Sequence, residues 1–183
     1  MSAVQKNHDD AVQGVEHWTN KGDVRLFMWE KFVDTPANKP AVLFVHGSSM
    51  ASQPTFDLTV PGRADSSVMD WFAKRGFVCW CVDMEGYGRS DKTRDITCDI
   101  SNGADDLAAA TDYIRRTRGI ESFLTYGISS GALRAALFTQ RYPDRVSRLA
   151  LDAFVWTGEG AHTLEQRRKK LPEFLSSNRR SID

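Results

Sequence analysis

A serine at the centre of a Gly-x-Ser-x-Gly segment is the residue best suited to chemistry in this sequence. The segment is Gly127-Ile128-Ser129-Ser130-Gly131, between an apolar run at 123–126 and a largely apolar stretch at 132–142. A tight strand-to-helix turn would project the serine hydroxyl above a sheet, and only glycines fit two positions away on each side. The following helix N-terminus offers amide donors to an oxyanion. The pattern predicts Ser129 as a nucleophile and the Ser130 amide as an oxyanion donor; the alternative is a simple Gly-Ser turn.

A second segment, His46-Gly47-Ser48, follows the apolar run 41–45. An oxyanion hole needs two amide donors that point at one place, and the amide of Ser48, beside the small Gly47, suits the second position. We interpret His46 as a structural, hydrogen-bonded histidine, because its loop is the wrong one for the base that Ser129 requires.

The base and the acid are harder to assign than the nucleophile. A serine hydroxyl is a weak nucleophile unless a base, normally a histidine oriented by a carboxylate, lies beside it. The only histidine after Ser129 is His162, just before a polar stretch, and we do not expect it to be catalytic. Asp152 follows the apolar run 146–151. It is either a triad acid or a residue that caps the strand end through backbone hydrogen bonds.

The segments around these residues alternate between strand and helix patterns. Short, continuous apolar runs are typical of strands buried on both faces. The predicted strands are residues 24–32, 41–45, 77–82, 123–126 and 146–151. The predicted helices are residues 67–76, 101–118, 132–142 and 164–175. This order predicts an α/β fold with a doubly wound, mostly parallel sheet, whose loops after His46, Asp83 and Gly127 share the ligand-binding edge.

Three segments together resemble the α/β-hydrolase superfamily, over residues 24–160. They are FVHGSS (44–49), VDMEGYGRSD (82–91) and YGISSGALRAALFTQRYPDRVSRLAL (126–151). The resemblance implies an α/β-hydrolase fold, Ser129 as the nucleophile, and the amides of Ser48 and Ser130 as the oxyanion hole. In that family the chain order is Ser, then Asp or Glu, then His, and some relatives hold the acid at the position of Asp152. Glu85 departs from the family, because many members carry Arg there; this bears on a local ion pair and not on the chemistry.

Two loops flank the predicted site. Residues 83–91 match neither glycine pattern of phosphate-binding loops, so we expect a rigid turn held by Asp83 and Arg89. Residues 49–63 form a long loop that would overhang the site and shape an acyl or leaving-group pocket, with Phe56 among its apolar side chains.

Composition narrows the class of protein further. The 183 residues are 41% hydrophobic and 26% charged, and the formal net charge is zero, which does not suit a nucleic-acid binder. The basic run at 167–170 is therefore interpreted as a solvated helix face. Cys79 and Cys81 are expected to be buried free thiols on one strand face, and with Cys98 they match no disulfide framework or metal motif.

These features predict a cytoplasmic enzyme that acts on a small molecule, with no metal or organic cofactor and no nucleic-acid or membrane partner. Neither a signal peptide nor a membrane span is visible in the sequence. The sequence does not indicate an oligomeric state.

We expect three parts: a polar lead-in at 1–23, a hydrolase core at 24–160, and the start of a lid at 161–183. The sheet would then be incomplete at its C-terminal side and would expose a strand edge. Two functions follow. The first is a serine hydrolase that cleaves a carboxylic ester or related acyl substrate through a Ser129 acyl-enzyme. The second is a truncated, non-catalytic relative that binds a small ligand or needs a second chain for activity.

Overall fold

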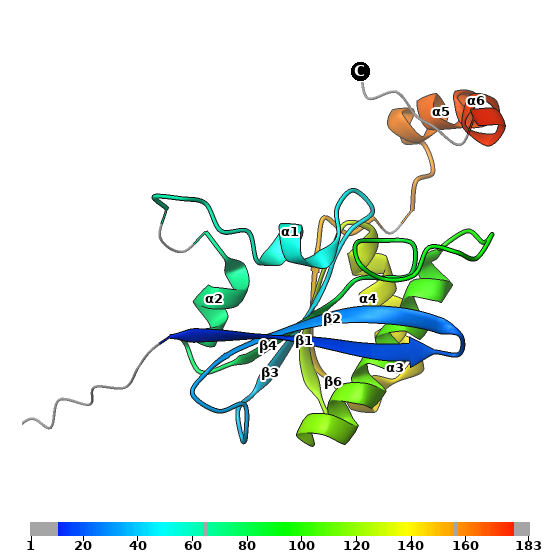
Figure 1. Ribbon diagram of the computed structural model, residues 1–183. Helices are drawn as coiled ribbons and strands as arrows, with labels where there is room; N and C mark the ends of the chain where they lie inside the picture. The colour runs from blue at the N-terminus through cyan, green and yellow to red at the C-terminus, as the bar shows by residue number, and fades with distance from the viewer. Residues whose placement is uncertain (1–10, 64–65, 156, 178–183) are drawn as a thin grey trace, which may run out of the picture.

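The fold is a six-stranded mixed sheet with helices on both faces, as the computed structural model shows (Figure 1). The structure describes residues 11–63, 66–155 and 157–177. The strands are β1 (Val12–Lys21), β2 (Val24–Val33), β3 (Ala41–Val45), β4 (Val78–Val82), β5 (Phe123–Ile128) and β6 (Val146–Asp152). Their order is β1-β2-β4-β3-β5-β6. Strands β4, β3, β5 and β6 are parallel, whereas β1 and β2 are antiparallel to their neighbours. The predicted doubly wound, mostly parallel sheet is confirmed.

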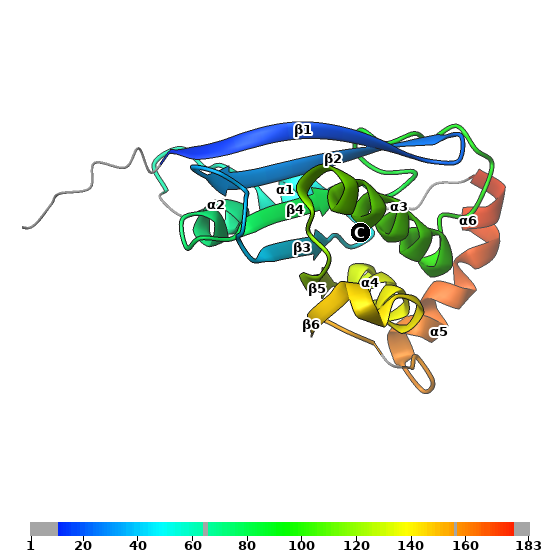
Figure 2. The same ribbon diagram turned by 90° about the horizontal axis from the view of Figure 1, so that it is seen from below.

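Helices pack against the sheet in two separate layers (Figures 1 and 2). The helices are α1 (Ser52–Phe56), α2 (Val68–Ala73), α3 (Ile100–Arg118), α4 (Ser130–Arg141), the 3₁₀ turn η1 (Pro143–Arg145), α5 (His162–Lys169) and α6 (Leu171–Ser177). Leu107 of α3 and Phe138 of α4 belong to one hydrophobic cluster, and Phe56 of α1 and Met69 of α2 to the other. Strands β3 and β4 lie between the layers and are buried at every position, which explains their continuous apolar sequences.

Two of the cysteines lie in the layer that α1 and α2 cover. Cys79 and Cys81 are buried free thiols of β4 and belong to the same hydrophobic cluster, as predicted. Burial raises the pKa of Cys79 to about 12 and also raises the pKa of Cys81. Both thiols therefore remain protonated at neutral pH and act as small apolar side chains.

The sequence predicted no strand before residue 24, but residues 12–21 of the polar lead-in form β1. Strands β1 and β2 make a hairpin whose loop is the two residues Gly22-Asp23, a pair that favours such tight connections. The polar side chains of β1 find partners in the protein: His17 Nε2 lies 2.9 Å from a carboxylate oxygen of Glu30, which is fully buried. Arg118 donates two further hydrogen bonds to Glu30. Residues 1–10 of the predicted lead-in lie outside the described residues.

Two helical segments also differ from the prediction. The expected loop at 49–63 contains the short helix α1. The expected single helix at 164–175 is divided at Lys170 into α5 and α6. Pro172 lacks an amide hydrogen and cannot donate to the carbonyl of Arg168, which accounts for the break.

Helices α5 and α6 lie beyond the carboxyl edge of the parallel strands and extend away from the sheet (Figure 1). Within the described residues, no helix combines the length and the apolar character needed to cross a membrane.

Candidate active site

Ser129 occupies the turn between β5 and α4, where its backbone has φ 57° and ψ −125°. A residue with a side chain rarely adopts this conformation, and such strain costs on the order of 1–3 kcal/mol. Two main-chain hydrogen bonds hold the turn: the Ser129 amide donates to the Asp152 carbonyl at 2.9 Å, and the Ala132 amide donates to the Ser129 carbonyl at 3.0 Å. The Ser129 side chain is exposed. The predicted tight strand-to-helix turn is therefore present.

The two glycines of the segment allow the close packing of this turn. A Cβ atom on Gly127 would lie 2.5 Å from the Gly131 carbonyl oxygen. A Cβ atom on Gly131 would lie 2.5 Å from the His46 carbonyl oxygen and closer still to that of Val45. All of these neighbours are main-chain atoms that no rotamer change can move aside.

The loop after β3 lies directly against Ser129. A Cβ atom on Gly47 would be 3.2 Å from Ser129 Cβ and 3.7 Å from Ser129 Oγ. Neither the Ser48 amide nor the Ser130 amide donates a hydrogen bond to a described residue. The Ser48 amide belongs to the loop after β3, and the Ser130 amide belongs to the turn after β5. These two segments meet at the Ser129 hydroxyl, as expected for loops at one edge of a parallel sheet.

His46 is a fully buried residue that supports this loop. Its Nδ1 lies 2.7 Å from the Gly47 carbonyl oxygen, and its Nε2 accepts a hydrogen bond from the Met84 amide at 3.1 Å. Nδ1 must therefore carry the proton, and burial lowers the pKa of His46 so that the ring stays neutral. Because C=O and N–H point in opposite directions across a trans peptide, the bond to Gly47 also sets the direction of the Ser48 amide. These contacts agree with the structural interpretation of His46.

Arg134 is a buried residue near the site that the sequence analysis did not single out. It donates a hydrogen bond to the His46 carbonyl oxygen at 3.1 Å, and its guanidinium lies 5.4 Å from the centre of the Tyr87 ring. No carboxylate of the described residues pairs with it. The signal was available: Arg134 is the one charged residue in the otherwise apolar stretch 131–138.

The loop after β4 is a rigid turn, as predicted, but the Arg89 side chain does not form it. The buried Asp83 carboxylate accepts hydrogen bonds from the Arg89 amide at 2.8 Å and from the Ser52 amide at 2.8 Å. The Arg89 guanidinium pairs instead with Glu16 of β1. Asp83 thus connects the loop that follows β4 to the start of α1, beside the site.

Asp152 contacts the Ser129 turn through its main chain, not through its carboxylate. Its carboxylate accepts a hydrogen bond from the Tyr126 hydroxyl at 2.5 Å. Burial and this hydrogen bond raise the pKa of Tyr126 to about 12, so the phenol remains a donor. His162 is exposed on α5, with Nε2 3.3 Å from the side-chain nitrogen of Gln166. Among the described residues, no histidine forms a hydrogen bond with Ser129 Oγ.

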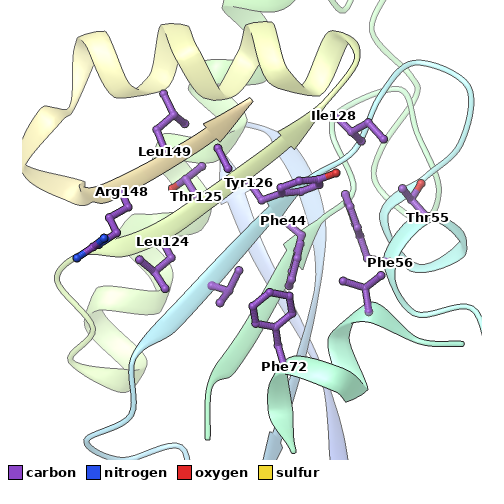
Figure 3. Close-up of a pocket in the computed structure, with 13 residues that line it drawn as sticks. Phe44, Thr55, Phe56, Phe72, Leu124, Thr125, Tyr126, Ile128, Arg148 and Leu149 are labelled. Carbon is purple, nitrogen blue, oxygen red and sulfur yellow. The ribbon is translucent and has the colours of Figure 1, made fainter. Parts of the chain in front are cut away.

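A cavity of about 670 Å³ lies on the α1/α2 side of the sheet (Figure 3). Apolar side chains make up most of its wall, and four of them are aromatic: Phe44, Phe56, Phe72 and Tyr126. One end of the cavity is at Ile128, the residue before Ser129, and Arg148 lies at the opposite end in Figure 3. Phe56 comes from the segment expected to shape a pocket. Across the residues that the structure describes, no cluster of three or more His, Cys, Asp or Glu side chains could hold a metal ion.

Known proteins share this architecture. The 2-hydroxy-6-oxononadienedioate/2-hydroxy-6-oxononatrienedioate hydrolase of Paraburkholderia phymatum is 32% identical over 122 residues, which are 64% of this chain and 37% of that protein. The structure of 2-hydroxy-6-oxo-6-phenylhexa-2,4-dienoate hydrolase from Rhodococcus sp. strain RHA1 matches 76% of this chain and 46% of its own, with a TM-score of 0.59 and 16% identity. A membrane phospholipase A, described as a bacterial virulence factor, matches 85% of this chain and 45% of its own, with a TM-score of 0.64 and 21% identity.

The chain therefore spans less than half the length of these three relatives. A family model described as the alpha/beta hydrolase fold matches residues 40–182. The predicted resemblance is confirmed: this chain belongs to the α/β-hydrolase fold family.

Proposed function

We propose that this chain carries the nucleophile and the oxyanion hole of a serine hydrolase acting on a carboxylic ester or related acyl substrate. The observation that carries the proposal is the Ser129 backbone at φ 57° and ψ −125°, which presents an exposed hydroxyl beside Gly47 and at the N-terminus of α4. Strain of this kind is concentrated at functional sites. The 12 residues of α4 direct the positive end of a helix dipole toward the same place.

In the proposed reaction, Ser129 Oγ attacks the carbonyl carbon and the carbonyl π electrons move to oxygen. The amides of Ser48 and Ser130 stabilise the resulting oxyanion. Collapse of the intermediate expels the protonated leaving group and leaves an acyl-enzyme, which water then cleaves to the acid and free Ser129. His46 and Arg134 hold the loop that carries the Ser48 amide, and the apolar cavity beside Ile128 would accommodate an apolar acyl group.

The proton of Ser129 passes to a base within hydrogen-bond reach, and that base returns it to the leaving group. In the test below, added imidazole is this base. Both ring nitrogens of His46 are engaged elsewhere, and His162 contacts Gln166 on α5. The Tyr126 contact supports the structural role of Asp152 over the triad role, so the proposal assigns Asp152 no catalytic step. No step requires a metal or an organic cofactor. The buried free thiols support a reducing, cytoplasmic location.

A second candidate substrate follows from the similarity to the Paraburkholderia protein, which is named for 2-hydroxy-6-oxo dienedioates. In this case Ser129 Oγ would attack a carbonyl carbon of such an acid instead of an ester carbonyl. The alternative is a truncated, non-catalytic chain that binds a small ligand or needs a second chain for activity. On its own, such a chain makes no use of the Ser129 hydroxyl.

Covalent labelling with a fluorophosphonate tests the proposal, with free imidazole added as an external base that can reach the exposed hydroxyl. We expect the 183-residue chain to be labelled, with a rate that rises with imidazole concentration. Ser129→Ala should lower the labelling by about 100-fold or more, because it removes the attacking atom. Ser130→Ala is the matched control and should still be labelled, since it leaves the backbone amide in place.

Labelling that persists unchanged in Ser129→Ala would overturn the nucleophile assignment. A folded wild-type chain that is not labelled at any imidazole concentration would favour the non-catalytic alternative. Comparison of a 4-nitrophenyl ester with a 2-hydroxy-6-oxo dienoate under the same conditions would then separate the two substrate classes.

A further inference from the structure

Arg134 of α4 is a buried cation, with only 2% of its surface accessible. Among the described residues, no carboxylate forms an ion pair with it, and its Nε has no hydrogen-bond partner. Two carboxylates of the facing helix α3 bind other cations: Asp105 pairs with Arg141, and Asp106 pairs with Lys21. A guanidinium does not lose its proton in a protein, and burial of an unpaired charge costs free energy. A cation kept at such a cost indicates that the charge has a use.

The packing of α3 against α4 leaves room for this side chain. The two helices lie side by side on one face of the sheet (Figure 2). A Cβ atom on Gly103 of α3 would lie 2.5 Å from Arg134 Cδ and 2.8 Å from Arg134 Nε. Glycine is unfavourable within a helix, so its presence here fits a requirement for space. Because helical side chains lean toward the helix N-terminus, Arg134 extends toward the end of α4 at which Ser129 lies.

The guanidinium holds one of two successive peptide groups in the loop after β3. Arg134 Nη1 donates a hydrogen bond to the His46 carbonyl at 3.1 Å, and the His46 ring donates one to the Gly47 carbonyl at 2.7 Å. These two carbonyls belong to the peptides on either side of the Gly47 Cα atom. Since glycine has wide backbone freedom, the two bonds together fix the directions of the Gly47 and Ser48 amides.

The charge of Arg134 also acts on this loop through space. A single peptide group, His46–Gly47, connects the guanidinium to the part of the loop that faces Ser129. Burial and the Arg134 charge both lower the pKa of His46, so the field of the cation extends into the loop. Water screens this field weakly, because Arg134 and His46 are both buried. A negative charge on an oxygen held by this loop would feel the same field.

We propose that Arg134 is a positioning residue of the oxyanion hole: it fixes the loop that carries the Ser48 amide, and its unpaired charge stabilises the oxyanion. This inference rests on the proposed role of Ser129 as the nucleophile. The oxyanion supplies a negative charge near Arg134 only when the transition state forms. An interaction made only in the transition state raises the rate of the chemical step. The buried cation thus lowers the stability of the fold and raises the rate.

The rate of fluorophosphonate labelling with added imidazole tests this role. In that reaction Ser129 Oγ bonds to phosphorus, fluoride leaves, imidazole takes the serine proton, and negative charge develops on the phosphoryl oxygen. Arg134→Met should lower the rate constant about 10-fold, less than the loss of a direct oxyanion donor, because Arg134 acts through the loop. Arg134→Lys keeps the charge and should recover most of the rate. Arg116→Met removes a charge from an exposed site on α3 and should leave the rate unchanged.

Stability separates this role from a purely structural one. Arg134→Met replaces an unpaired buried charge with an apolar side chain, so the midpoint of chemical unfolding should equal or exceed that of the wild type. A residue kept only for packing would lower the midpoint when replaced. Gly103→Ala displaces the Arg134 stem and should slow labelling in the wild type. In the Arg134→Met background it should not change the rate further, because the charge is already absent.

Arg134→Met labelled at the wild-type rate would overturn this inference and leave the assignment of Ser129 in place. A fall in both the rate and the unfolding midpoint that Arg134→Lys does not restore would also overturn it, since it would indicate a packing role. A folded wild-type chain that is not labelled at any imidazole concentration would instead overturn the proposed function, and this inference with it.

Discussion

Replacing Gly131 with alanine should destabilise the fold by more than about 4 kcal/mol, a loss at the severe end for one substitution. The new methyl group would lie 2.5 Å from the His46 carbonyl oxygen and closer still to the Val45 carbonyl oxygen. To relieve the overlap, either β3 or the first turn of α4 must move. Strand β3 is an inner strand of the parallel sheet, and the first turn of α4 follows Ser129 directly. The change would therefore disturb the sheet and the site together.

Denaturant unfolding measures this effect, with Gly119→Ala as the matched control. Gly119 ends α3 at φ 66°, and a Cβ atom there would meet nothing within 4 Å. We expect a loss of only about 1–2 kcal/mol, the ordinary cost of a left-handed backbone for alanine. Equal losses for the two variants would show that the close approach of Gly131 to β3 does not exist.

Replacing Lys21 with methionine should remove about 3–5 kcal/mol of stability, the usual cost of leaving a buried charge without its partner. Lys21 Nζ donates to Glu85 at 2.9 Å and forms an ion pair with Asp106, and both carboxylates are buried. The Glu85 amide also donates to Asp106 at 2.9 Å. Without Lys21, no cation of the described residues would pair with Asp106, whereas Glu85 would keep its two hydrogen bonds from Arg94.

The loss should depend on pH in a defined direction. The Arg94 contact holds the pKa of Glu85 at about 2, so Glu85 stays ionised down to that pH. Burial raises the pKa of Asp106 above its ordinary 3.8, and the loss of Lys21 would raise it further. Protonation of Asp106 removes the unpaired charge, so the difference between Lys21→Met and wild type should shrink as the pH falls toward 4.

Chemical unfolding of both proteins at neutral and mildly acidic pH checks this expectation. Lys169→Met, at an exposed position on α5, is the control and should change stability by less than about 0.5 kcal/mol. A Lys21→Met loss no larger than that of the control, or one that grows at acidic pH, would contradict the account. The Lys21–Glu85–Arg94 contacts also explain how the chain accommodates Glu85 where many family members carry Arg.

The sequence predicted the parallel strands because burial on both faces leaves a continuous apolar signature. Strands β3 and β4 are uninterrupted apolar runs. The Ser129 turn was predictable for a different reason: the serine and the glycines at positions 127 and 131 form a short pattern within one turn, even though the atoms that exclude a side chain at Gly131 belong to Val45 and His46. Neither inference needed knowledge of distant contacts.

The sequence did not predict β1, because its polar residues resemble those of a loop until their partners are known. Glu30 and Tyr113, which form hydrogen bonds with the His17 ring, lie 13 and 96 residues further along the chain. The roles of Arg134 and of the His46 ring likewise depend on which carbonyl lies opposite, a matter of tertiary packing. The division of α5 from α6 was predictable from Pro172 alone.

The most direct test of the central claim is the location of the fluorophosphonate label. Trypsin should release residues 119–134 as one peptide that contains Ser122, Ser129 and Ser130. If Ser129 is the nucleophile, fragment-ion masses will place the added phosphonyl group on Ser129 alone, and imidazole will increase its amount. A label on Ser122 or Ser130, or on another peptide with this one unmodified, would contradict the account.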